Sequence, residues 1–165
     1  MNGIMSLRKK PWNRVDLPVY SVSSKTERNE NMHICTYVSS VSMVPKRMMV
    51  AIYQGTQTLE NLTTNPHFVL QLLCDQQYNL VRRLGMQSGK KINKIQALEK
   101  RKLLVVWNGF KVLKDALAVM QLQAINQVDG GDHRMYVCEV LAYKNLNEGE
   151  PLTTRILYEK RIICT

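Results

Sequence analysis

The sequence predicts a mostly β fold, a barrel or a sandwich rather than a doubly wound Rossmann sheet. Short runs rich in β-branched and aromatic residues recur along most of the chain. The clearest is a long antiparallel hairpin, in which Ala118–Val128 and Met135–Tyr143 flank the turn-forming Asp129–Asp132. Strands and helices do not alternate regularly, so the pattern lacks the βαβ units of a parallel sheet.

The other predicted strands are bounded by residues that favour turns. Asn29–Asn31 and Asn108-Gly109 predict turns, and Pro45 and Gly55 mark the ends of apolar runs. The predicted strands are Val19–Ser24, Met32–Ser42, Met48–Tyr53, Phe68–Cys74 and Leu103–Trp107.

Three short helices are expected between these strands. Leu59 and Leu62 lie three residues apart in the first, which ends at Asn65-Pro66. The predicted helices are Thr58–Asn65, Gln77–Leu84 and Ile95–Lys102. The polar, basic segment Ser88–Lys94 has no apolar period and predicts a loop.

Length and charge limit the classes of function. The 165 residues are enough for one domain with its own core, and the 45% of apolar residues argue against disorder. We expect one domain over 1–165, with 1–17 and 158–165 peripheral. The formal net charge of +10 favours an anionic partner such as a phosphorylated cofactor or a nucleic acid.

The cysteines favour a reducing compartment. Cys35, Cys74, Cys138 and Cys164 include no C-x-x-C pair, so we expect small apolar packing groups rather than disulfides. The basic Arg8–Lys10 is not followed by an apolar stretch of signal-peptide type, and no apolar run is long enough to span a bilayer. A cytoplasmic protein without a membrane partner is therefore expected. No His, Cys and acidic residues have metal-ligand spacing, so no metal is expected.

Four polar segments carry the candidate chemistry. The sequence contains neither a G-x-G-x-x-G nor a Walker A motif, so the two commonest nucleotide-binding loops are absent. Each segment taken alone has an ordinary structural explanation, such as a strand, a helix cap or a turn. The four segments are Asn31–Ser42, Tyr53–Thr58, Ser88–Lys91 and Gly131–His133.

The order and spacing of these segments resemble the flavin reductase-like family, which binds FMN on a Greek-key split β-barrel with a few short helices. Asn31–Ser42 is similar to the family's N-x-M-T-A-S-x-x-x-S-V-S strand, and Gly85–Lys94 to its G-x-x-S-G-R-x-x-D-K stretch. Gly131–His133 matches a late G-D-H motif. The resemblance extends from about Pro18 to Leu152.

The resemblance implies an FMN site built from these segments. Hydroxyls and backbone N–H groups at a helix start, together with lysines, are suited to bind a phosphate, and an apolar strand is suited to the flavin ring. The implied cofactor-binding residues are Cys35, Thr36, Tyr37, Ser39, Tyr53, Thr56, Thr58, Ser88, Gly89, Lys90 and Lys91.

The chain departs from the family pattern at several of these positions. Cys35-Thr36 stands where the family has Ala-Ser, and Tyr37 is bulky for a position that is often small. Lys90 replaces the usual Arg, and Asn93 the usual Asp. No basic residue lies shortly before Thr58, where Gln54 and Gln57 stand instead.

His133 is the candidate catalytic residue. The resemblance implies a place beside the flavin, where the imidazole would position the reactants or deliver a proton. The implied function is an NAD(P)H-dependent FMN oxidoreductase that acts as a homodimer, with NAD(P)H as co-substrate.

Two other functions remain open from the sequence. One is an FMN-holding electron-transfer protein without reductase activity. The other is a basic β-barrel that binds nucleic acid, but aromatic residues make up only 7% and none lies in an interleaved basic-aromatic run. We therefore expect no specific nucleic-acid partner.

Overall fold

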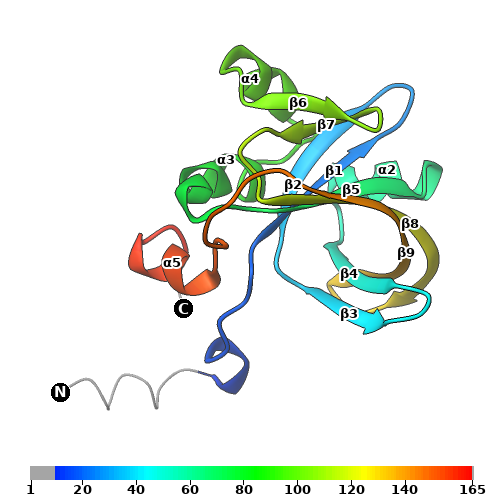
Figure 1. Ribbon diagram of the computed structural model, residues 1–165, viewed down its shortest axis with the longest axis horizontal. Coiled ribbons are helices and arrows are strands. Elements are labelled where there is room, and N and C mark those ends of the chain that lie inside the picture. Colours follow the sequence, from blue (N-terminus) through cyan, green and yellow to red (C-terminus); the bar gives the residue numbers. More distant parts are fainter. Residues whose placement is uncertain (1–9, 165) are drawn as a thin grey trace.

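The computed structural model describes residues 10–164 and has the mostly β barrel architecture that the sequence predicts (Figure 1). The strands of the main sheet are β1 (Tyr20–Lys25), β2 (Glu30–Cys35), β3 (Val38–Ser42), β4 (Arg47–Tyr53), β5 (His67–Leu72), β8 (Ala118–Asp129) and β9 (His133–Asn145). A separate ribbon pairs β6 (Leu104–Trp107) with β7 (Phe110–Leu113).

The main sheet has seven strands in the order β2-β1-β5-β8-β9-β4-β3, and every neighbouring pair is antiparallel. Strands β2 and β3 follow each other in the chain but lie at opposite ends of this order. The chain therefore crosses from one edge of the sheet to the other at Thr36-Tyr37, and β2 also contacts β4. This crossing curls the sheet into a barrel.

The crossing corrects the prediction of one strand over Met32–Ser42. That run has uniform β composition, so periodicity cannot reveal where the chain changes its pairing partner. In the structure, β2 pairs with β1, and β3 pairs with β4. At the crossing, the Ala51 amide donates to the Tyr37 carbonyl at 2.9 Å.

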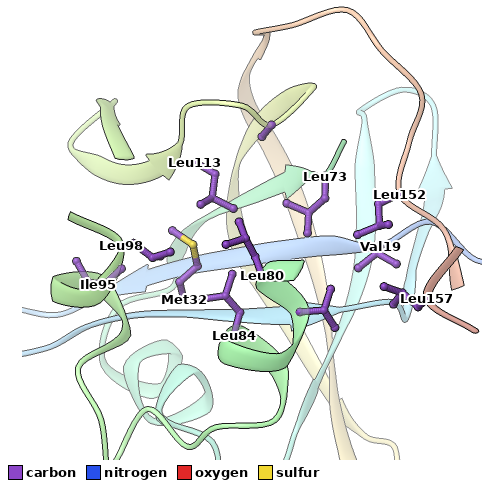
Figure 2. Packing of buried hydrophobic residues seen from close by; sticks show 12 residues of the cluster. Val19, Met32, Leu73, Leu80, Leu84, Ile95, Leu98, Leu113, Leu152 and Leu157 are labelled. Atoms are coloured by element: carbon purple, nitrogen blue, oxygen red, sulfur yellow. The ribbon is translucent and has the colours of Figure 1, made fainter. Parts of the chain in front are cut away.

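A small apolar cluster around Phe110 packs β7 against β5 and β8, and two larger clusters form the rest of the core. One fills the barrel with side chains such as Val50, Phe68 and Leu122. The other lies between the sheet and the helices and includes Met32 and Leu84 (Figure 2). Both faces of the sheet are thus buried along β2, because successive side chains of a strand point to opposite sides.

The helices are short, and the three that the sequence predicts begin within two residues of their predicted positions. The helices are η1 (Pro11–Asn13), α2 (Gln57–Thr64), η2 (Asp75–Leu80), α3 (Val81–Gly85), α4 (Lys94–Lys100) and α5 (Thr154–Glu159). The single helix predicted over Gln77–Leu84 is the 3-10 turn η2 followed by α3. Among the described residues, none of these helices is long and apolar enough to cross a membrane.

Three elements were not predicted, η1, β7 and α5. The Asp16 carboxylate accepts hydrogen bonds from the Arg155 amide at 2.8 Å and the Thr154 hydroxyl at 3.0 Å, which holds the start of α5. Leu157 on α5 is buried, and Ile162 and Ile163 pack against the same cluster. The end of the chain therefore contributes to the core, although it was expected to be peripheral. Residues 1–9 of the expected peripheral start, and residue 165, lie outside the described residues.

The cysteines divide into two groups, and none forms a disulfide with another. Cys35 and Cys138 pack inside the barrel as expected, and burial raises the pKa of each thiol to about 12. Cys74 is half-buried and Cys164 is exposed, so the expectation of apolar packing does not hold for Cys164.

Candidate functional site

The first part of the site is an apolar pocket on the outer face of β4 and β9. Strand pairing sets Tyr53 beside His133 and Ala51 beside Met135. The crossing from β2 to β3 brings Tyr37 to the same face. The pocket has a volume of about 330 Å³, within the usual range for small-molecule sites. It is lined by Leu17, Thr36, Tyr37, Val38, Met49, Ala51, Gly130, Asp132, His133 and Met135.

The His133 ring is held between two tyrosines. Its centroid lies 5.1 Å from that of Tyr37 and 5.2 Å from that of Tyr53, and the Tyr53 contact is edge-on. Both tyrosines are about half exposed, at 53% and 52%. An aromatic surface therefore borders the open side of the pocket.

A short loop contact orients the imidazole. The Asp132 carboxylate lies 2.6 Å from His133 Nδ1, so that nitrogen carries the proton and Nε2 is directed away from the carboxylate. The loop itself is fixed from β4, because the Gln54 amide donates to the Asp132 carbonyl at 2.9 Å and the Gln54 side chain to the Gly131 carbonyl at 2.8 Å. The left-handed φ of +95° at Gly131 permits this turn.

The second part of the site is the start of α2, which follows Tyr53 directly. The Thr56 hydroxyl accepts from the Leu59 amide at 3.2 Å and donates to the Tyr53 carbonyl at 2.9 Å, so it caps the helix. The amides of Gln57 and Thr58 have no acceptor within the helix. These backbone donors favour an anion next to the aromatic pocket.

A buried amide joins α2 to the basic loop. Asn31 donates from Nδ2 to the Thr58 hydroxyl at 2.9 Å, and both residues are buried. A Cβ on Gly89 would lie 2.2 Å from Asn31 Oδ1, so only glycine permits this close approach of the loop backbone. Asn31 thus sets the position of both the helix start and the Ser88–Lys91 loop.

The lysines of that loop face a polar pocket of about 630 Å³. Lys90 forms an ion pair with Glu60 on α2, which ties the loop to the helix. Gly89, Lys90, Lys91 and Gln57 all line the pocket. Helix amides and loop lysines therefore meet in one region that is suited to bind a phosphate.

Two basic side chains are buried next to these parts. His33 is 8% exposed, and its Nδ1 has no hydrogen-bond partner among the described residues. Burial, together with the nearby charges of Lys94 and His133, lowers the pKa of His33 to about 3. Lys94 is 4% exposed, donates to the Leu84 carbonyl at 2.6 Å, and has its pKa lowered by burial to about 8.

The structure brings together most of the predicted residues but not all. Thr36, Tyr37 and His133 line the apolar pocket, and Tyr53 contacts His133. Ser39 is exposed on β3 and pairs with Met49 of β4. Ser88 is exposed and accepts from the Lys90 amide at 3.3 Å.

Two predicted side chains are not at the surface of the site. The Cys35 thiol lies inside the barrel and donates to the Ala51 carbonyl at 3.3 Å, so only the backbone of Cys35 can reach a ligand. The Thr58 hydroxyl is fully buried against Asn31. Thr58 can therefore contribute its amide but not its side chain.

Sequence reasoning missed three residues of this region. The sequence indicates Asp132 only as part of the G-D-H motif, and Asn31 only as the start of the N-x-M strand. Leu17 was assigned to the peripheral start of the chain, yet it lines the apolar pocket. The adjacency of Asp132 to His133 was a usable signal, whereas Leu17 reaches the pocket through tertiary contacts alone.

Gly89→Ala should destabilise the protein and displace the basic loop. The added Cβ would collide with Asn31, so we expect a loss of about 1–3 kcal/mol in the free energy of unfolding, measured with urea. Gly85→Ala is the matched control, because its Cβ would meet Ile34 at an ordinary 3.4 Å. Equal unfolding energies for the two variants would contradict the proposed role of Gly89.

Protonation of His33 should lower the free energy of unfolding as the pH falls below about 6.5. Its pKa is near 6.5 when unfolded and about 3 when folded, so the unfolded state binds more protons between these values. The contribution of His33 to the free energy of unfolding is therefore present above pH 6.5, and about 2 kcal/mol of it is lost by pH 5. Urea unfolding of wild type and His33→Gln at pH 7.5 and 5.0 measures this loss. The variant should lose about 2 kcal/mol less than wild type, and an equal loss in both would contradict the assignment.

Comparison with known proteins agrees with this architecture. Residues 12–163 match the family model described as flavin reductase like domain. No curated protein sequence matches the chain.

Solved structures of low sequence identity share the fold. An FMN-binding protein from Thermus thermophilus is 23% identical, with a TM-score of 0.75 over 86% of this chain and 80% of that one. Flavoredoxin from Methanosarcina acetivorans is 16% identical, with a TM-score of 0.71 over 92% and 78%. The flavin reductase of the styrene monooxygenase from Pseudomonas putida S12 is 19% identical, with a TM-score of 0.69 over 84% and 86%. Since the family match covers nearly all of the described chain, this protein belongs to the flavin reductase-like domain family.

Proposed function

We propose that this protein binds FMN and uses it to take a hydride from NADH or NADPH and pass the electrons to free flavin or another acceptor. One observation carries the proposal. Tyr53 contacts His133 beside the apolar pocket, and the chain runs from Tyr53 directly to Thr56 and the first amides of α2, which suit a phosphate. A flavin mononucleotide has the same order of parts, an aromatic ring at one end and a phosphate at the other.

The lining of the apolar pocket fits a flavin ring. Met49, Ala51 and Met135 provide an apolar floor, and Thr36 adds a hydroxyl at its edge. The FMN-binding protein from Thermus thermophilus and the flavin reductases of the same fold support this choice of ligand.

The donors beyond Tyr53 fit a phosphate. The first amides of α2 point out of the helix end, and Thr56 keeps that end in place. Lys91 lines the polar pocket, and no ion pair is found for it among the described residues. Lys90 is paired with Glu60, so it offers less charge to a ligand than the sequence suggests.

The protein would position the reactants and manage a proton, while the bound flavin accepts the hydride and passes its electrons on. His133 is suited to both tasks, because Asp132 fixes Nδ1–H and leaves Nε2 directed away from that carboxylate. Tyr37 and Tyr53 limit the rotation of the ring from both sides. The buried Lys94 adds positive charge near His33, which would favour an anionic ligand.

A homodimer would complete the site. The β3–β4 hairpin, at the lower right of Figure 1, exposes Val41, Met43 and Val44 by 53%, 85% and 92%. Leu141 and Tyr143 on β9 are also exposed, and β3 is an edge strand. Exposed apolar groups beside an unpaired strand edge favour association, and a second copy of this chain is the partner we propose. A cytoplasmic setting is part of the proposal and is supported by the free thiols.

FMN should bind more tightly than riboflavin, because only FMN carries the phosphate. A tenfold difference corresponds to about 1.4 kcal/mol, which is less than one charge-assisted hydrogen bond can supply. Flavin fluorescence titration measures both affinities. Lys91→Ala should weaken FMN several-fold and riboflavin hardly at all, while Lys91→Arg retains the charge. Equal weakening of both ligands would show that Lys91 does not contact the phosphate.

His133→Ala should keep FMN bound but slow its reduction by NADH or NADPH about 10- to 100-fold, because the reactants lose a positioning group. Anaerobic stopped-flow bleaching of the flavin measures the rate, and a melting curve checks the fold. His67→Ala, on β5, is the matched control. An unchanged rate in folded His133→Ala would remove the role of this residue. FMN binding without any bleaching of wild type would instead favour an electron-transfer protein.

The wild-type protein should have the mass of a dimer in solution. Met43→Lys together with Val44→Lys should convert it to a monomer, because two charges would be buried in the interface. Sedimentation equilibrium at micromolar concentrations tests this. Lys46→Ala on the same hairpin is the control, and a monomeric wild type would overturn the proposal.

A further inference from the structure

A further cavity of about 420 Å³ shares no lining residue with the apolar pocket or the polar pocket of the candidate site. Its walls come from η2, the end of α4, the turn after β7 and the segment after β9. The volume lies within the usual range for sites that bind small molecules. The proposed function places no part of the flavin or of its co-substrate there.

The floor of this cavity is apolar and rigid. Leu80 and Leu113 are 5% and 1% exposed, and both belong to the cluster between the sheet and the helices (Figure 2). Leu103 packs against the same cluster. Gln77 also lines the cavity, and its Oε1 accepts from the Cys74 amide at 2.9 Å, which fixes that wall. The floor therefore offers apolar surface to an aliphatic group of a ligand.

The rim of the cavity carries charges of both signs. Arg101, Asp115 and Glu148 line it, and all three residues are exposed. Within residues 10–164, none of these three side chains forms an ion pair. A guanidinium and two carboxylates around one cavity attract each other but are not in contact, so a ligand with both signs of charge can bridge them.

The backbone beneath these charges is held by hydrogen bonds. Asn147 donates from Nδ2 to the carbonyls of the residues before and after Asp115, both at 2.8 Å. The Arg101 amide donates to the Leu98 carbonyl at 3.1 Å, where α4 ends. The rim is thus formed before a ligand arrives, and a preformed site loses less entropy on binding.

We infer that this cavity binds a free α-amino acid with an aliphatic side chain. The planar guanidinium of Arg101 suits the carboxylate of the ligand, because it can donate to both oxygens at once. Asp115 and Glu148 suit its ammonium group, and the leucine floor suits its side chain. The site goes beyond the proposed function, because the flavin chemistry uses none of these residues.

The ligand arm of the test titrates the whole ¹⁵N-labelled chain with L-leucine and follows amide chemical shifts. Leucine should bind with a Kd of about 1 mM or lower and shift the amides of 74–80 and 147–149. Leucinamide lacks the carboxylate, N-acetylleucine lacks the ammonium, and glycine lacks the aliphatic group. Each should bind at least about tenfold more weakly, because each loses one of the three contacts.

The variant arm uses Arg101→Ala, which removes the guanidinium at an exposed position. It should weaken leucine at least about tenfold and leave the affinity for leucinamide unchanged. Arg101→Lys should restore part of the affinity, because lysine retains the charge without the planar fork. Lys100→Ala is the matched control, since it removes a neighbouring exposed charge and lines none of the pockets named above.

Several results would overturn the inference. One is the absence of amide shifts at up to about 10 mM leucine. Another is leucinamide or glycine binding as tightly as leucine, which would indicate a simple amine site. Equal effects of Arg101→Ala and Lys100→Ala would remove the assigned role of the guanidinium. Displacement of leucine by FMN would place the amino acid in the flavin site instead.

Discussion

The buried Asn31 side chain is the contact on which the geometry of the site depends. Its amide group hydrogen-bonds the Thr58 hydroxyl at the start of α2, and its oxygen lies where only a glycine fits at position 89. One strand residue therefore positions both a helix end and a basic loop. A buried amide left without its partners costs about 1–3 kcal/mol, so this junction has little freedom to rearrange. The donors for an anion are thus in place before any ligand binds.

The crossing from β2 to β3 positions the apolar pocket of the site. Because the chain passes from one edge of the sheet to the other at Thr36-Tyr37, Tyr37 reaches the face that carries Ala51 and His133. The same crossing closes the barrel around Cys35 and the inner cluster. Barrel closure and formation of the pocket therefore have one structural cause.

Electrostatics separate the two parts of the site. His33 is kept neutral by burial and by the nearby charges of Lys94 and His133, whereas Lys94 keeps most of its charge at neutral pH despite its burial. Lys90 is neutralised by Glu60. Lys91 and Arg28 line the polar pocket and form no ion pair among the described residues, so they supply positive charge to a ligand there. This distribution favours phosphate at one end and an uncharged ring at the other.

The sequence by itself determined the elements with strong local signals. Alternation predicted the β8–β9 hairpin, and the spacing of Leu59 and Leu62 before Asn65-Pro66 predicted α2. The ordered motifs also indicated the family, which the family match confirms. Only the tertiary structure decided that Met32–Ser42 is two strands, that the Cys35 thiol and Thr58 hydroxyl face inward, and that Leu17 lines the pocket. These features depend on which segments pair and pack across long separations in the chain, and local composition carries no record of such partners.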